Sequence, residues 1–392
     1  MMKTKFLSAA AILFAVQFAS AQTNSAFSGA EGFGQFASGG RGGEIVHVTT
    51  LDDSGAGSFR DAVSKPNHIV VFDVGGIIHL QSNVAVSSDI SLLGQTAPGD
   101  GVMIYGRSVS FSGQKNVIVR YLRFREGIAG DKGKCSVNLS GGANMIFDHC
   151  SIEWGRWDCL GLTQGSHDIT FQNCIIGEGV DPQHFGSLSD EVTNITYMHN
   201  LWINNQSRNP KAKGKIQYIN NVVYNWGVCG LVGGHSGADH FQDVVGNYFI
   251  AGPNSNSHAV GECAATDHIF LKGNFVDDNK DGKLNGRELT QKDFDSAKSE
   301  DKVISEAPTF VDAPSNGSID NLKIESAQSA VSSILANAGC SLHRDAVDAR
   351  LIDEVKSFGT RGKISHNETE AGGTGELPEI HAPANLKALD TE

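Results

Sequence analysis

The stretch from Ser207 to Lys215 carries four cations, Arg208, Lys211, Lys213 and Lys215, in a chain whose formal net charge is −13. A basic cluster in an acidic protein can be a solvated turn or a binding place for an anion. If carboxylates lie beside these basic side chains, the site would favour a bound hard metal ion next to a bound polyanion. The preceding sequence offers three carboxylates and a histidine, namely Asp158, Glu178, Asp181 and His184.

The chemistry that such a set could perform is the removal of a proton next to a carboxylate. A divalent cation can coordinate the substrate carboxylate, acidify the neighbouring proton and stabilise the charge that develops. An arginine would then be poised as the base, a role that the residue types alone do not suggest, because a guanidinium is normally always charged. The residue types alone leave a charged surface turn as the alternative.

An internal repeat predicts how these residues are positioned. Seven strand-like segments recur between residues 117 and 276, and successive members of their shared column are 21 to 28 residues apart. This step is too short for a strand–helix–strand unit, so we expect parallel strands in successive coils of a solenoid. The column consists of Leu122, Cys150, Cys174, Asn200, Asn221, Asn247 and Asn274.

The predicted fold class is therefore all-β, a single-stranded parallel β-helix. Its buried column asparagines are expected to satisfy one another in a ladder, which is a structural role. Residues 58–63 predict a short helix that caps the N-terminal mouth. Residues 326–338 and 344–355 predict two later helices with Ser326 and Asp345 as caps. We expect a β-helix domain over residues 22–295, a helical segment over 296–358 and a flexible tail over 359–392.

The first 21 residues predict a secretory signal peptide, with a basic start, an apolar run and a small-residue cleavage site at Ala19–Ala21. We therefore expect a secreted, periplasmic or cell-surface protein. No later stretch reaches the roughly 20 apolar residues of a membrane span. The acidic balance argues against general nucleic-acid binding, so any polyanionic partner must be bound locally. We expect a monomer.

Seven cysteines are widely spaced and match no zinc pattern, and an odd number leaves at least one free thiol. Export permits disulfides, and buried free cysteines that act as small apolar residues are the equal alternative. They are Cys135, Cys150, Cys159, Cys174, Cys229, Cys263 and Cys340.

A second candidate metal site is independent of the basic cluster. Residues 277–288 match the calcium-binding loop of an EF-hand, with Gly282 at position 6 and Leu284 at position 8. Because the loop follows the last repeat strand directly, we expect a Ca²⁺ ion that fastens the end of the solenoid. The alternative is an acidic surface turn. The expected ligands are Asp277, Asn279, Asp281, Lys283 through its carbonyl, Asn285 and Glu288.

Several motifs in order resemble the pectate lyases of polysaccharide lyase family 1. The similarity covers most of residues 28–355. The matching segments are Ala30–Val63, Val70–Leu80, Gly94–Gly101, Ile146–His149, Ser207–Pro210 with Lys213, Asn220–Gly227 and Asp345–Val355.

This resemblance implies a right-handed parallel β-helix that cleaves polygalacturonate by calcium-assisted β-elimination and releases 4,5-unsaturated oligouronides. Arg208 is similar in position to the catalytic base, which takes the C5 proton. Lys213 stands where the family has a second arginine for the substrate carboxylate, and Lys211 and His184 are further expected substrate ligands. Asp158, with Asp181, is expected to hold the substrate-side calcium. For Asp148 and His149, in the segment Ile146–His149, we expect a structural role.

The chain also departs from the family pattern. Cys135 and Cys159 stand where relatives often carry acidic residues, and Gln183 replaces an expected lysine. These changes leave open an inactive or weakly active β-helix that binds acidic glycans, or a lyase of another pectic polymer. A hydrolase is a poorer alternative, because no pair of aspartates in adjacent repeats suggests an acid and a base.

Overall fold

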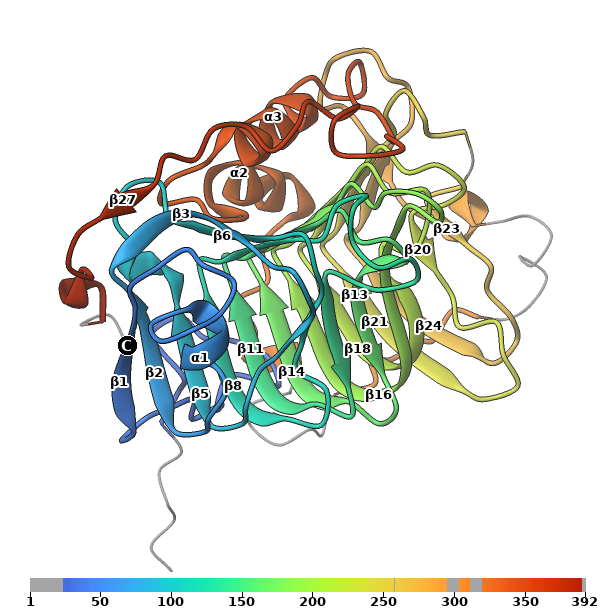
Figure 1. The fold of residues 1–392 in the computed structure, drawn as a ribbon. Helices are drawn as coiled ribbons and strands as arrows, with labels where there is room; N and C mark the ends of the chain where they lie inside the picture. The colour runs from blue at the N-terminus through green and yellow to red at the C-terminus, as the bar shows by residue number, and fades with distance from the viewer. Residues whose placement is uncertain (1–23, 257, 295–302, 311–318, 390–392) are drawn as a thin grey trace, which may run out of the picture.

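The computed structural model describes residues 24–256, 258–294, 303–310 and 319–389. The predicted signal peptide lies outside them. Within the described residues the chain winds into a solenoid of parallel strands (Figure 1). The predicted all-β parallel β-helix is confirmed. None of the described helices is long and apolar enough to cross a membrane.

The first face of the solenoid carries the repeat strands, each paired in parallel with the strand one coil away. Met145 pairs with Val117 on one side and with Ile169 on the other, as the shared column predicts. The strands of this face are β1 (Glu44–Val48), β2 (His68–Phe72), β5 (Ile90–Leu93), β8 (Lys115–Arg120), β11 (Ala143–Asp148), β14 (His167–Gln172), β16 (Phe185–Met198), β18 (Lys211–Ile219), β21 (His240–Val245) and β24 (Asp267–Lys272).

Two further rows of strands complete each coil. The second face consists of β3 (Val74–His79), β6 (Val102–Tyr105), β9 (Arg123–Arg125), β12 (Ser151–Glu153), β15 (Ile175–Gly177), β17 (Leu201–Ile203), β19 (Val222–Tyr224), β22 (Tyr248–Ile250) and β25 (Phe275–Asp277), with antiparallel end strands β26 (Arg287–Glu288) and β27 (Ile380–His381). The third row consists of β4 (Val84–Ala85), β7 (Val109–Ser110), β10 (Val137–Ser140), β13 (Asp158–Thr163), β20 (Leu231–Val232) and β23 (Val260–Gly261), joined by the first halves of β16 and β18.

The corner between the first and second faces explains the repeat. The residue before each column position adopts a left-handed backbone with φ between 51° and 66°, which turns the chain in a single step. Asp148 and His149 lie at this corner: Asp148 accepts a hydrogen bond of 2.9 Å from Arg120, and His149 stacks on Tyr121. The left-handed residues are Tyr121, His149, Asn173, His199, Asn220, Gly246 and Gly273.

The predicted asparagine ladder is confirmed. The side-chain amide of Asn221 donates to the amide oxygen of Asn247 at 3.1 Å, and Asn247 donates to Asn274 at 2.9 Å. The main-chain N–H of Asn221 also donates to Asn247, at 2.7 Å, and all these residues are buried. The ladder therefore satisfies buried polar groups that no water reaches.

Replacing Asn247 with alanine is expected to lower the free energy of unfolding by about 2–4 kcal/mol, because each buried polar group left without a partner costs about 1–3 kcal/mol. The groups that lose a partner are the main-chain N–H and the side-chain amide of Asn221 and the carbonyl of Tyr218. Urea unfolding measures the change. Asn83→Ala on the surface is the matched control, expected to stay within about 0.5 kcal/mol. A loss below 1 kcal/mol in Asn247→Ala would contradict the ladder's importance.

A continuous apolar core fills the interior of the coils. Its rings stack along the solenoid axis, with centroids 4.6 Å apart for Phe147 and Phe171 and 5.7 Å apart for Phe171 and Tyr197. The predicted N-terminal helix is present as α1 (Phe59–Ala62), capped by the Ser58 side chain. Its residue Phe59 is fully buried in the same core, so α1 closes off apolar surface at this end of the solenoid.

Both predicted C-terminal helices are present and pack on the second face (Figure 1). Helix α2 (Ala327–Asn337) is capped by Ser326, and α3 (Ala346–Val355) is capped by Asp345. The remaining one-turn elements are the 3₁₀ helices η1 (Gly94–Thr96), η2 (Gln291–Asp293), η3 (Ile319–Asn321) and η4 (Leu386–Leu389).

The described part of the expected flexible tail, residues 359–389, lies along the solenoid (Figure 1). Strand β27 pairs with β3, and Glu368 is buried with hydrogen bonds to Tyr105 and to the N–H of Ile128. This packing differs from the loose tail that the Gly-rich composition predicted, because a few long-range polar contacts fix the segment. The division into domains stays a prediction.

The seven cysteines all lie in the described residues, and none of them forms a disulfide. Six are buried and Cys135 is half-buried. Cys150 and Cys174 occupy the column below the asparagines. The cysteines thus serve as small apolar residues, the second of the two alternatives.

Candidate active site

Arg208 lies in the connection between β17 and β18. Its Nη1 is 3.2 and 3.1 Å from the two carboxylate oxygens of Asp158, and its Cζ is 4.0 Å from the centre of the Phe185 ring. The Asp158 side chain is 1% exposed and that of Arg208 is 19% exposed. The ion pair and the cation–π contact therefore fix Arg208, while one side of it stays accessible.

Three successive coils bring these side chains together. Asp158 pairs in register with Phe185, and Phe185 forms a bridge with Ser207. Because neighbouring strands are about 4.8 Å apart, Arg208 must cross the Phe185 ring to reach Asp158 two coils away. Phe185 thus lies in the coil between Asp158 and Arg208, and its ring supports the guanidinium that reaches across.

The charge of Asp158 depends on its burial. Burial raises the pKa of Asp158 to about 6, and the charges of Arg208 and Lys211 oppose this shift. At neutral pH the carboxylate is therefore ionised and offsets the charge of Arg208. Burial also raises the pKa of the neighbouring Cys135 thiol, so this residue stays neutral where relatives often have an acid.

Lys211 is positioned by a chain of side chains from the following coils. Its Nζ is 3.2 Å from Nε2 of His235, and Nδ1 of His235 is 3.3 Å from Oε2 of Glu262. Burial lowers the pKa of Lys211, and the nearby charge of Arg208 lowers it further. Arg208 therefore lies close enough to Lys211 to disfavour its charged form.

Arg208 and Lys211 line one pocket of about 580 Å³ together with His184. The structure thus brings three predicted site residues to one place. Lys213 does not line this pocket, because its Nζ pairs with Asp190 at 2.7 Å. The other lining residues are Pro182, Gln183, Phe185, Gln206, Ser207, Val228, Val232 and Glu262.

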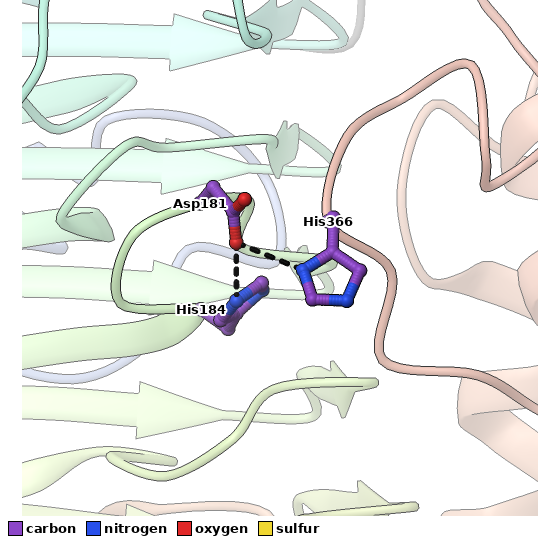
Figure 2. Close-up of side chains that lie close together, drawn as sticks. All are labelled: Asp181, His184 and His366. Atoms are coloured by element: carbon purple, nitrogen blue, oxygen red, sulfur yellow. Dashed lines mark hydrogen bonds and ion pairs between the residues drawn. The ribbon is translucent and has the colours of Figure 1, made fainter.

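Asp181 and His184 lie beside this pocket in a group with His366. One carboxylate oxygen of Asp181, Oδ1, is 2.9 Å from Nε2 of His184 and 3.0 Å from Nδ1 of His366 (Figure 2). The hydrogen bond with His366 lowers the pKa of Asp181, and the same bond raises the pKa of His366. The C-terminal segment therefore contributes His366 to a recess next to the pocket, and His184 lines both.

The two aspartates expected to share a substrate-side calcium are engaged separately. Asp158 is bound to Arg208, and Asp181 is bound to two histidines. Among the described residues, the potential metal ligands gathered within 4.8 Å of one another are those of Asp181, His184 and His366. An all-oxygen site of the kind that calcium prefers is not assembled from Asp158 and Asp181.

The EF-hand-like loop forms the turn from β25 to β26. Asn279 and Asp281 each accept a hydrogen bond of 2.9 Å from the N–H two residues further on, and Asp277 accepts one of 3.0 Å from Asn285. Gly282 has φ 83°, which permits the sharp turn at position 6. The loop thus directs several oxygens to its inner side, a donor set that fits calcium.

Four residues of this region were missed by sequence reasoning: Phe185, His235, Glu262 and His366. Phe185 directly follows His184, and the repeat step could have placed it in the coil between Asp158 and Arg208. His235 and Glu262 lie in irregular stretches that carry no repeat signal. His366 lies in the segment expected to be a loose tail.

Glu126 is a further buried carboxyl, one coil before the strand that carries Asp158. It accepts hydrogen bonds from the N–H groups of Asp131 and Arg156 at 3.1 and 3.3 Å. Burial raises the pKa of Glu126 to about 7, and these hydrogen bonds oppose the shift. The folded protein therefore binds this proton more tightly than the unfolded chain does.

A pH-dependent stability follows from Glu126. Since the folded pKa lies above the unfolded one, the stabilisation is present at pH 5 and is lost as the pH rises through about 7. Between pH 8 and pH 5 the wild type should gain, relative to Glu126→Gln, on the order of 2 kcal/mol. Urea unfolding of both proteins at both pH values measures this, and an identical pH dependence would show that Glu126 does not titrate in this range.

No family model matches the chain, but curated relatives do. The chain is 42% identical over 360 residues to "Probable pectate lyase C" of Emericella nidulans, which is 92% of this chain and 82% of that protein. It is 42% identical over 353 residues to the Aspergillus terreus protein of the same name, which is 90% of this chain and 82% of that protein.

Solved structures share the fold. The cedar pollen allergen jun a 1 has a TM-score of 0.57 at 18% identity, over 79% of this chain and 92% of that one. A pectate lyase bound to a hexasaccharide has a TM-score of 0.56 at 12% identity, over 83% of this chain and 100% of that one. These likenesses support the parallel β-solenoid.

The chain is a parallel β-solenoid, and its curated relatives show that it is an enzyme of the polysaccharide lyase class. The level and extent of identity to its curated relatives show that the chain belongs to the pectate lyase family. The resemblance expected from the sequence motifs is thereby confirmed.

Proposed function

We propose that this chain is a secreted pectate lyase that cleaves polygalacturonate by β-elimination, with Arg208 as the base. The observation that carries the proposal is the single pocket lined by Arg208 and Lys211. A polyuronate presents one carboxylate per sugar, and cationic side chains bind carboxylates by charge-assisted hydrogen bonds. The names of the curated relatives agree with a pectic substrate.

In the proposed reaction Arg208 first gives up a proton to the solvent, and as a neutral guanidine it then takes the C5 proton of a uronate. The electrons of the C5–H bond form the double bond between C4 and C5, the C4–O bond breaks with its electrons on the departing sugar oxygen, and this oxygen takes a proton from water. Lys211 and His184 would bind the substrate carboxylate, whose charge increases as the proton leaves. Lys213, which pairs with Asp190, would bind a neighbouring uronate.

Two charged side chains beside Arg208 bear on its proposed role. Lys211 adds a second positive charge to the same pocket, where it can bind a substrate carboxylate. Asp158, at 3.1 Å, stabilises the guanidinium that forms once the proton has been taken, much as a carboxylate stabilises the imidazolium of a catalytic triad. The pair therefore suits a residue that must gain a proton in the transition state.

Calcium dependence of the reaction stays an expectation from the family. A calcium ion beside the substrate would polarise the carboxylate and acidify the C5 proton. Asp158 is engaged by Arg208 and Asp181 by two histidines, so these residues do not fit a substrate-side calcium as they stand. The steps above use only this chain's own side chains.

An ultraviolet assay tests the proposal. Purified protein mixed with polygalacturonate should generate the absorbance of a 4,5-unsaturated uronide, measured with added calcium and again with chelator. Product analysis separates a lyase from a hydrolase, because only the lyase leaves a double bond. Absence of this absorbance with polygalacturonate and with other pectic polymers would refute the proposal.

A binding protein for acidic glycans is the second candidate. Its support is the neutral thiol at Cys135 and the full engagement of Asp158 by Arg208, which leave few free carboxylates for catalysis. Salt-sensitive binding of polygalacturonate without product would favour this candidate over the lyase.

Secretion rests on the predicted signal peptide, residues 1–21. Expression of the full chain in a bacterial host should deliver a shortened protein to the periplasm or medium. Its N-terminal sequence should begin near Gln22. An unprocessed protein that stays inside the cell would contradict the predicted export.

We also propose that the loop of residues 277–288 binds one Ca²⁺ ion that stabilises the end of the solenoid. Its ligands would be the oxygens of six residues, and the loop leads from β25 directly into the antiparallel end strand β26. Calcium bound there would join the two strands across the turn. The proposed ligands are Asp277, Asn279, Asp281, Lys283 through its carbonyl, Asn285 and Glu288.

Removal of calcium by a chelator is expected to lower Tm, because an ion that binds only the folded state adds about 2.7 kcal/mol at 100 times its Kd. Asp281→Ala should abolish this shift. Asp278→Asn is the matched control, since Asp278 occupies a loop position without a ligand role and pairs with exposed Arg287. Equal chelator shifts in wild type and Asp281→Ala would place the calcium elsewhere.

A further inference from the structure

A group of one carboxylate and two imidazoles joins the solenoid to the C-terminal segment. Asp181 and His184 lie in the connection between β15 and β16, whereas His366 follows α3. In Figure 2 the two rings approach the same carboxylate from different segments. Oδ1 of Asp181, Nε2 of His184 and Nδ1 of His366 all lie within 4.8 Å of one another.

The orientation of His184 indicates what its Nε2 does. Its Nδ1 is 3.1 Å from the carbonyl oxygens of Gly179 and Ser365, so Nδ1 must carry a proton and donate it. A neutral ring then presents a lone pair at Nε2, which faces a carboxylate oxygen at 2.9 Å. Two lone pairs in contact repel unless a cation lies between them.

This arrangement is the one that metal-binding histidines adopt, because such a ring usually donates its other N–H to a backbone carbonyl or a carboxylate. The backbone of the group is fixed without any metal. The N–H of Asp181 donates to the carbonyl of His366 at 3.0 Å, and the N–H of His366 donates to Glu370 at 2.9 Å. The three ligands are therefore gathered in advance.

We propose that Asp181, His184 and His366 form a binding site for a divalent transition metal, Zn²⁺ being the best fit. Imidazole nitrogens suit zinc and its neighbours, whereas calcium takes oxygen ligands. Three protein ligands leave coordination positions open, as in catalytic zinc sites. His184 and His366 line a recess of about 280 Å³, so a water or a carboxylate oxygen can reach the metal.

The site has a consequence for the pocket of Arg208. His184 lines that pocket as well as the recess. A metal bound by His184 would fix one wall of the pocket and would tie residues 365–368 to the solenoid. Zinc would therefore stabilise the C-terminal segment, and this effect does not depend on lyase activity.

Metal binding is best measured on untagged full-length protein saturated with calcium, so that the oxygen-rich loop of residues 277–288 is filled. Titration with Co²⁺, followed by visible absorption, should give one site per chain, and Zn²⁺ should displace the cobalt and raise Tm. His366→Ala should weaken zinc binding by at least about tenfold. His381→Ala is the matched control, an exposed histidine of the same segment that pairs with Glu379.

Asp181→Asn is the second variant and should also weaken zinc binding. Calcium should not compete with zinc for this site in either variant. Absence of zinc binding, or equal binding by wild type and His366→Ala, would overturn the proposal. A Tm that depends on pH but not on zinc would also overturn the proposal. A proton on Nε2 of His184 would then be the cation between this ring and the Asp181 carboxylate, in place of the metal. The ultraviolet lyase assay is a separate readout, so either proposal can fail alone.

Discussion

Arg208→Ala is expected to lower kcat on polygalacturonate by about 10³-fold, because removal of a positioned base typically costs 10²–10⁴ in rate. KM should change less, since Lys211 and His184 still line the pocket. Arg208→Lys should also be nearly inactive, because an ammonium group cannot form the same paired contact with Asp158 and is a point charge at a different place. Initial rates of ultraviolet absorbance measure all three proteins.

Replacing Arg208 also affects stability, and a control must separate this effect from the loss of catalysis. Asp158 is buried and pairs with Arg208, so Arg208→Ala leaves a buried carboxylate alone and should also lower stability. The double variant Arg208→Ala, Asp158→Asn removes that charge and should regain most of the stability while staying inactive. Recovery of the rate in the double variant would mean that Arg208 only supports the fold.

Much of the fold was predictable because the sequence repeat identifies the buried positions directly. A residue in the column of Asn221 must be small, or it must be able to form hydrogen bonds within the column. The coil length fixes the number of residues to the next column position. Helix caps were equally local: Ser326 and Asp345 each precede an observed helix by one residue. Patterns of this kind depend on backbone geometry that neighbouring residues determine.

The site was predictable only in part, because contacts between side chains of different coils depend on how far each side chain extends and on how deeply it is buried. The sequence placed Asp158 and Arg208 on one side of the solenoid, but it could not tell that the carboxylate meets the guanidinium 50 positions away. His366 meets Asp181 across 185 positions. No repeat links the C-terminal segment to a coil, so its contribution was invisible in the sequence.

Arg125→Met is expected to lower the free energy of unfolding at pH 7 by about 3–5 kcal/mol, the usual cost of breaking a buried ion pair on one side. Arg125 is the last residue of β9, and its buried side chain pairs with Glu153 of β12 at 2.8 Å and with Asp348 of α3 at 2.7 Å. It also contacts Asp345, the N-cap of α3. Without the guanidinium, Glu153 loses its ion pair, whereas Asp345 and Asp348 keep their pairs with Arg123, at 3.3 and 3.9 Å.

The pH dependence of this loss separates charge from packing. Burial raises the pKa of Glu153, and Arg125 opposes that shift, so without Arg125 the carboxyl should bind a proton more readily. The destabilisation by Arg125→Met should therefore be smaller at pH 5 than at pH 8, as measured by urea unfolding. Arg361→Met is the control, because its exposed pair with Asp353 should contribute less than about 0.5 kcal/mol.

A folded Arg125→Met protein should keep the kcat of the wild type, because Arg125 fastens α3 to the second face whereas Arg208 and Lys211 lie beside the third row of strands. This contrast with Arg208→Ala distinguishes the two largest expected effects: one variant loses stability and keeps catalysis, the other loses catalysis. A cost below 1 kcal/mol for Arg125→Met, equal at both pH values, would mean that the carboxylates are already protonated and that packing alone holds α3 on the solenoid.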